Sequence, residues 1–202
     1  GSWDVSNVTN MSFMFYKSSL FNADIGSWDV SSVTNMSFMF FNATSFNRDF
    51  SAWDVSSTNN MAYMFFGAAD FNGDISLWDV SNVVNISHMF QEASSFNGDI
   101  SSWDVSSVAK TSEMFSGAVN FNRDISSWDV SNVWSMSEMF FGASSFSNEN
   151  YTLFLQGISQ LNLKSNVEFK SDSKYCDATA RQKIIDNFNW KIEDAGLSTN
   201  CN

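Results

Sequence analysis

A strict 25-residue period runs through residues 1–150 and constrains the fold more than any other feature. Each period contains one Trp followed by Asp-Val-Ser, and a Met-Phe pair recurs with the same step. The tryptophans are Trp3, Trp28, Trp53, Trp78, Trp103 and Trp128. Because a unit of this length is too short for a propeller blade or a helix pair, the period predicts a solenoid in which each unit forms one coil.

Each coil is expected to combine a short parallel strand with a short helix or turn, as in a leucine-rich-repeat-like solenoid. The alternation in Asp74-Ile75-Ser76 predicts a strand with Ile75 pointing inward. The segment from Asn10 to Phe15 is expected to begin as a helical turn capped by Thr9 or Asn10.

One apolar set keeps the same phase in every unit, which favours a core over a ligand-binding box. For one coil we expect the interior to contain Phe21, Ile25, Trp28, Val30, Val33, Met36, Met39, Phe40 and Ala43. Burying these large side chains would stabilise a narrow coil by a few kcal/mol each, on the order of 25 cal/mol per Å².

The repeat pattern decays after Phe146, which predicts a repeat region over residues 1–150 and a C-terminal capping segment over 151–202. We expect the cap to be α+β, with a helix from Asp177 to Phe188 between strands at 167–169 and 190–192. The chain opens at Gly1 without a methionine and without an N-terminal cap, which predicts an excised fragment with a truncated first repeat.

The charge of the chain excludes several classes of partner. The net charge is −12 and only 10 residues are basic, so nucleic acid and anionic membrane surfaces are not expected partners. No apolar run reaches the roughly 20 residues that a membrane-spanning helix needs. We therefore expect no membrane insertion of this fragment.

The two cysteines, Cys176 and Cys201, flank the predicted helix and closing strand of the cap. We favour a disulfide over two reduced thiols, because no histidine lies near them for a zinc or catalytic-thiol site. A disulfide would indicate an oxidising compartment.

The repeat, read as Phe-Asn-x-Asp-Ile-Ser-x-Trp-Asp-Val-Ser-Asn-Val-Thr-Asn-Met-Ser-x-Met-Phe, resembles the BspA-like leucine-rich-repeat surface proteins, which include repeat lipoproteins of mycoplasmas. The resemblance covers roughly residues 1–150, and the tail from Cys176 to Gly196 is similar to the cap of such arrays. It implies display at the cell surface, with roles in adhesion and partner binding. The chain departs from many members by using Phe, Trp and Met in place of Leu.

Two columns of aspartate are expected along the array. Those after Trp should cap turns, because Asp and Ser side chains bond backbone N–H groups two residues on. The other column contains Asp24, Asp49, Asp74, Asp99 and Asp124. For this column Ca²⁺, which takes six to eight oxygen ligands, is an alternative to turn capping. No other cofactor is expected.

Signals for an enzyme are weak. His88 is the only histidine, and other units place Phe, Tyr or Glu at its position, so a solvated surface residue is expected. No nucleophile elbow, phosphate-binding loop, HExxH or CxxC pattern occurs. We therefore expect no catalytic residues.

The binding surface is predicted where the repeats disagree. Two positions per unit vary, and in the first three units they hold Phe13, Tyr16, Phe38, Phe41, Tyr63 and Phe66. Opposite the core stripe of a helix they would form an exposed patch; a tilted helix would leave them partly buried against their neighbours. We expect a non-catalytic, extracellular or cell-surface adhesion module that binds a protein, a glycan or another copy of itself. A carbohydrate- or ice-binding polar wall, assisted by Ca²⁺, is the alternative.

Overall fold

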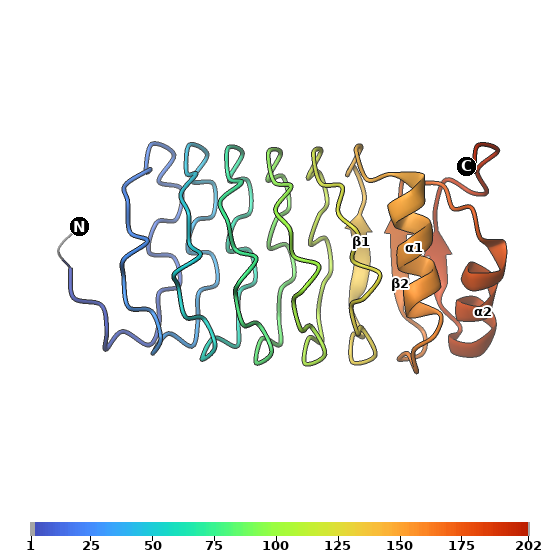
Figure 1. Ribbon diagram of the computed structural model, residues 1–202, viewed down its shortest axis with the longest axis horizontal. Coiled ribbons are helices and arrows are strands. Elements are labelled where there is room, and N and C mark those ends of the chain that lie inside the picture. Colours follow the sequence, from blue (N-terminus) through green and yellow to red (C-terminus); the bar gives the residue numbers. More distant parts are fainter. Residues whose placement is uncertain (1–2, 202) are drawn as a thin grey trace.

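A computed structural model describes residues 3–201 of the chain. Successive 25-residue units lie side by side along the long axis, and the C-terminal segment lies at one end (Figure 1). The regular elements are β1 (Met136–Phe140), α1 (Asn148–Ile158), β2 (Glu168–Ser171), α2 (Ala178–Phe188) and β3 (Lys191–Glu193). The strands form one parallel sheet in the order β1-β2-β3, so the C-terminal segment adds two strands to the last unit.

Backbone hydrogen bonds join each coil to the next along the Met- and Phe-rich segment. In the first coil, the N–H of Met11 donates to the Asn35 carbonyl at 2.9 Å, and the N–H groups two, four and six residues further on donate in the same way. Alternate N–H groups close turns within the coil, as where Tyr16 donates to the Phe13 carbonyl at 3.2 Å. The N–H groups of this segment are thus divided between the ladder to the next coil and local turns.

The segment from Asn10 to Phe15 therefore differs from the helical turn that we expected. Residues 3–147 contain no helix. The backbone is left-handed at Phe13 (φ 62°) and again at Lys17 (φ 54°), which a right-handed helix does not permit. A helix of two turns is marginal in isolation, and the ladder to the next coil gives the same N–H groups better partners.

The expected strand at Asp74–Ser76 is also a turn. The Asp74 Oδ1 atom accepts a hydrogen bond from the Ser76 N–H at 2.9 Å, and the Trp78 N–H donates to the Ile75 carbonyl at 3.2 Å. Ile75 is buried, as the alternation predicted. The Asp74 side chain takes up the Ser76 N–H locally. Parallel pairing between coils is instead found along the Met- and Phe-rich segment.

The interior consists of stacked rings and methionines. Eight of the nine residues expected inside one coil are buried, and Phe21 is half-buried. Ring centroids of Trp78 lie 6.4 Å from Trp53 and 6.3 Å from Trp103, with nearly parallel planes. The Trp78 Nε1–H donates to the Phe50 carbonyl at 3.0 Å, so the indole polar atom is satisfied inside the core.

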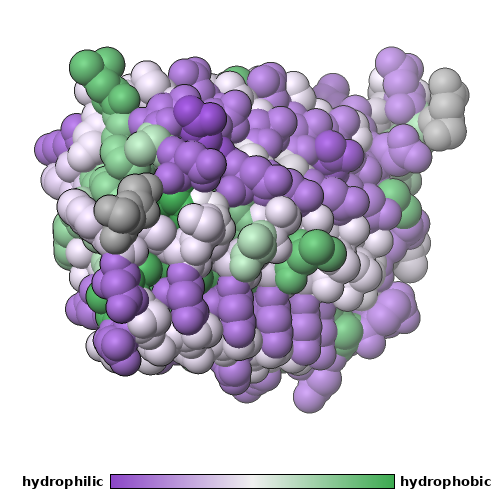
Figure 2. Space-filling view, turned by 60° about the vertical axis from the view of Figure 1, so that its left-hand side comes forward, coloured by the Kyte–Doolittle hydropathy of each residue, from purple (hydrophilic) through white to green (hydrophobic). Residues whose placement is uncertain are grey.

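The surface of the array repeats as the interior does. On the face that Figure 2 shows, hydrophilic side chains predominate and lie in rows that recur from coil to coil, with hydrophobic residues scattered among them. Where a row keeps one type of residue, a departure from the repeat changes the chemistry of the surface at one place only.

Both helices lie in the C-terminal segment (Figure 1). The helix expected from Asp177 is α2, with the Asp177 carboxylate accepting from two N–H groups of its first turn. The sequence analysis did not predict α1, and the boundary expected after residue 150 falls inside it. Ser147 explains the difference: its Oγ caps α1, while its N–H still bonds to Asn122 Oδ1 of the preceding coil at 3.0 Å.

Replacing Trp78 by Ala should lower the free energy of unfolding by about 3–5 kcal/mol, because the cavity left by a buried indole is not refilled. Urea denaturation monitored by circular dichroism measures this change. The neighbouring Leu77→Ala is the matched control, since Trp78 is 3% exposed and Leu77 is 77% exposed. Equal effects of the two changes would contradict the packing described above.

Candidate functional site

Two columns of stacked rings lie on the surface of the first coils, and we call them the aromatic columns. The first contains Phe13, Phe38 and Tyr63 and continues to His88, with centroid distances of 4.7, 4.5 and 4.1 Å. The second contains Tyr16, Phe41 and Phe66, with centroid distances of 4.8 and 4.5 Å. The structure thus brings together all six residues that the sequence analysis proposed as a binding surface.

These six rings lie outside the buried core. Phe13 is 53% and Tyr16 38% exposed, while Phe38 and the other three rings are half-buried. The near-parallel stacking covers the faces of the inner rings and leaves ring edges at the surface. The i, i+3 pairing within each coil comes from the hydrogen-bonded turn that links Phe13 to Tyr16, not from a helix.

The first aromatic column sits on left-handed backbone. The φ angles of Phe13, Phe38 and Tyr63 are 62°, 59° and 60°. This conformation costs a non-glycine residue about 1–2 kcal/mol, so the surrounding ladder must hold it in place. Four residues later each coil is left-handed again, and there four of the six coils use Asn or Gly, as at Asn42 and Gly67, while the other two use Lys17 and Glu92. That Asn/Gly column was the sequence signal for left-handed turns, and our reading of a helix missed it.

Polar side chains continue the aromatic columns into the fourth and fifth coils. His88 Nδ1 lies 2.7 Å from Gln91 Oε1, and Gln91 Nε2 donates to Glu113 Oε2 at 2.7 Å. His88 also stacks on Tyr63. We expected a solvated histidine; instead it is half-buried, because the coil spacing places it against the neighbouring ring.

The coils approach one another more closely on this face than on the tryptophan side. Neighbouring rings of the aromatic columns are 4.1–4.8 Å apart, whereas the centroids of successive tryptophans from Trp53 to Trp128 are 6.3–6.5 Å apart. The rings of the aromatic columns are therefore more closely stacked than the tryptophans of the core.

Both aspartate columns cap turns. The Oδ1 atoms of Asp24, Asp49, Asp74, Asp99 and Asp124 each accept from the N–H two residues on, at 2.7–3.1 Å. The aspartates after Trp do the same. Within residues 3–201 no group of three or more His, Cys, Asp or Glu is arranged to hold a metal ion. These carboxylates are thus engaged in local backbone structure.

Hydrogen bonding changes the acidity of several of these aspartates. The Ser31 hydroxyl, and then the Ser31 N–H, lower the pKa of Asp29 below its ordinary value, although the carboxylates of Asp54 and Asp4 oppose the shift. The pKa of Asp54 is lowered in the same way by Ser56. A serine hydroxyl at each of these turns thus stabilises charged carboxylates that stack in a row.

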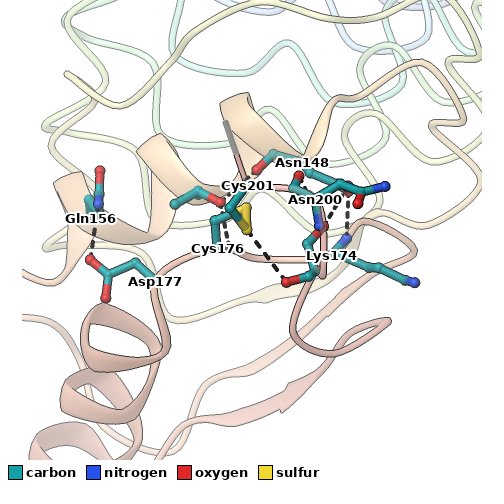
Figure 3. Close-up of a disulfide and its surroundings, with 9 residues drawn as sticks. Asn148, Gln156, Lys174, Cys176, Asp177, Asn200 and Cys201 are labelled. Carbon is teal, nitrogen blue, oxygen red and sulfur yellow. Dashed lines mark hydrogen bonds between the residues drawn. A yellow bond between two sulfur atoms is a disulfide. The ribbon is translucent and has the colours of Figure 1, made fainter.

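Cys176 and Cys201 form a disulfide, as we favoured from the sequence, with 5.6 Å between their Cα atoms (Figure 3). The N–H of Cys176 donates to Thr152 Oγ1 at 2.8 Å, and the Lys174 N–H donates to Asn148 Oδ1 at 3.0 Å. The disulfide therefore ties the end of the chain to the segment that packs along α1.

The chain is thus built from stacked 25-residue repeats and a disulfide-bonded C-terminal segment. The chain belongs to the family described as "Mycoplasma protein of unknown function, DUF285", whose model matches residues 1–85 and 67–188. No curated protein and no solved structure matches it. Neither of the helices described between residues 3 and 201 has the length and apolar character needed to cross a membrane.

The lowered pKa values predict acid sensitivity. A carboxylate whose pKa is lower in the folded state stabilises the fold above its ordinary pKa near 3.8, and this contribution is lost as the pH falls through the folded-state pKa. The free energy of unfolding should therefore decrease between about pH 5 and pH 2. Asp54→Asn keeps an oxygen acceptor for Ser56 and should reduce this pH dependence in urea titrations; an unchanged slope would contradict the assignment.

The double change Cys176→Ser and Cys201→Ser removes the disulfide and should lower the free energy of unfolding by about 3 kcal/mol. The reason is that the disulfide joins residues 25 apart and so restricts the unfolded chain. Chemical denaturation of the oxidised protein and the double variant measures the difference. Intact mass provides the control: the oxidised protein should weigh two hydrogens less than its reduced form. Labelling of both thiols without reduction would contradict the disulfide.

Proposed function

We propose that this chain is a BspA-like, leucine-rich-repeat-type solenoid that acts as a non-catalytic binding module outside the cell or at its surface. In this proposal the aromatic columns are the contact surface and a protein is the partner. The observation that carries it is the set of six neighbouring surface rings in the first three coils.

The fold itself does not require aromatic residues at these positions. The fourth and fifth coils place His88, Gln91, Glu113 and Ser116 there, with the same ladder and turns. Surface aromatics gathered in one patch commonly mark contact sites, and aromatic residues dominate the energetics of interfaces. The aromatic columns are therefore better explained by binding than by folding.

The geometry of the rings favours a protein partner for this surface. The inner rings are covered by their neighbours at 4.5–4.8 Å and present edges. The two columns also pack on one another, with centroids 5.5–6.0 Å apart, so they form one apolar surface that suits apolar side chains laid across it. Flat stacking on a sugar would need ring faces, and in the described part of the columns only the end rings Phe13, Tyr16 and Phe66 lack a ring of their column on one side. The net charge of −12 favours a partner with a basic rim around an apolar centre.

The disulfide supports the location. Disulfides persist in oxidising environments and are rare in the cytosol. The surface proteins that the repeat resembles are displayed outside the cell, which agrees with this inference. The disulfide therefore supports the proposed location outside the cell.

The triple change Phe38→Ser, Phe41→Ser and Tyr63→Ser tests the proposal. The variant should remain folded, with a loss of about 0.5–1.5 kcal/mol per ring stack, because later coils already carry polar residues at these positions. Binding to a panel of purified extracellular-matrix and cell-surface proteins should fall at least about tenfold, as measured by biolayer interferometry.

The exposed Leu77→Ser serves as the control for a change in surface apolarity away from the aromatic columns. Unfolding of the triple variant would show that the rings are structural. Equal binding by the triple variant and the parent protein would place the contact surface elsewhere.

A further inference from the structure

Trp134 is a surface indole at the opposite end of the array from the aromatic columns. The equivalent positions in the other coils hold Thr9, Thr34, Asn59, Val84 and Ala109. Trp134 is 56% exposed, and within residues 3–201 no aromatic ring stacks on it. The Lys110 Nζ atom lies 5.1 Å from its ring centroid. The Lys110 ammonium thus lies over one face of the indole, and among the described residues no ring covers the other.

Two adjoining shallow hollows cross the outer face of the three-stranded sheet, and the first of them begins at this indole. The first, of about 160 Å³, is lined by Trp134, Ser135, Met136, Ser137, Asn166 and Glu168. The second, of about 180 Å³, shares Ser137 and Glu168 and extends over β2 to Lys191 and Glu193 of β3. We call the two together the Trp134 groove. It spans two strand spacings, about 10 Å.

The Trp134 groove offers hydrogen-bonding groups that the fold leaves available. Asn189 donates to Asn166 Oδ1 at 2.7 Å, which orients that amide. In the described part of the chain, neither Asn166 Nδ2 nor Ser137 Oγ forms a hydrogen bond with another protein group. Glu168 adds a carboxylate beside them.

The charges of the groove largely cancel. Lys191 lies 3.3 Å from Glu168 and 3.7 Å from Glu193, and Lys170 lies 3.8 Å from Glu138. All of these side chains are at least a third exposed, so the pairs are solvated and can form further hydrogen bonds. A ligand of strong charge of either sign therefore gains little here. A ligand rich in hydroxyl groups suits such a surface, because each hydroxyl can donate to a carboxylate and accept from a neighbouring ammonium group.

We propose that the Trp134 groove binds a neutral oligosaccharide. The apolar face of one pyranose ring lies on the Trp134 indole, and hydroxyl groups of the sugar bond to Asn166, Ser137 and Glu168. An exposed aromatic face beside a few fixed polar groups is the arrangement that gives both affinity and orientation to a small ligand. The inference goes beyond the proposed function, because the groove and the aromatic columns lie on different coils and are tested by different variants.

The experiment is isothermal titration calorimetry of the intact protein with neutral oligosaccharides: cellohexaose, chitohexaose, xylohexaose and a linear galacto-oligosaccharide. A heparin hexasaccharide is the anionic comparison. At least one neutral probe should bind with a dissociation constant below about 1 mM. Trp134→Ala should weaken that binding at least about tenfold. The variant should remain folded, because Ala109 occupies the same position in the preceding coil.

Two further variants separate this site from others. Leu77→Ala and the triple change in the aromatic columns should leave oligosaccharide binding unchanged, so loss of protein binding and loss of sugar binding are distinguishable. The absence of binding to every neutral probe, binding to heparin alone, or equal binding by Trp134→Ala with an unchanged melting temperature would each overturn the proposal.

Discussion

Every second N–H group of the Met- and Phe-rich segment donates to a carbonyl of the next coil, as Met11 does to Asn35 at 2.9 Å, and the rest of the structure depends on this ladder. Each acceptor lies one position before the residue equivalent to the donor, as Asn35 lies before Met36, so every unit must have the same length. An insertion inside the ladder would shift every later donor from its acceptor. The same register brings equivalent residues of neighbouring coils together. Trp78 stacks on Trp103, and the Asn97 N–H donates to Asn72 Oδ1.

The ladder also explains the surface chemistry. It holds Phe38 and Tyr63 in left-handed conformations that cost each residue about 1–2 kcal/mol, and the stacking of their rings, about 0.5–1.5 kcal/mol per pair, offsets part of that cost. Stacking of identical units places carboxylates in rows, where they repel one another. Hydrogen bonds from serines such as Ser31 favour the charged form of each carboxylate and make such rows tolerable.

The period alone was enough to predict the inward-facing residues, because a residue such as Met39 or Trp78 keeps one phase in every unit. It could not distinguish a helical turn from successive tight turns, since both place residues three apart on one side. Asn42 and Gly67 carried the missing information: a recurrent Asn or Gly at one position indicates left-handed backbone. The Cys176–Cys201 disulfide could be predicted from the sequence because the chain has only two cysteines.

The candidate sites were harder to predict, because they depend on departures from the repeat. The aromatic columns could be found in the sequence as positions that vary between units. Their stacking and half-burial could not, because both depend on the distance between coils. Trp134 was missed, since its hollow is completed by Asn166 and Glu168, which come from the C-terminal segment beyond α1. Only the parallel pairing of β1 with β2 brings these residues together.

The most direct test of the account compares two internal deletions. Removing residues 61–85 takes out one 25-residue unit and restores the ladder register, whereas removing residues 61–84 leaves it shifted by one residue. Thermal unfolding monitored by circular dichroism should show a single cooperative transition for the 61–85 deletion, a few degrees below that of the parent protein. The 61–84 deletion should lose cooperativity or melt at least roughly 10 °C lower. Equal melting temperatures for the two deletions would contradict the claim that a 25-residue hydrogen-bond register holds the molecule together.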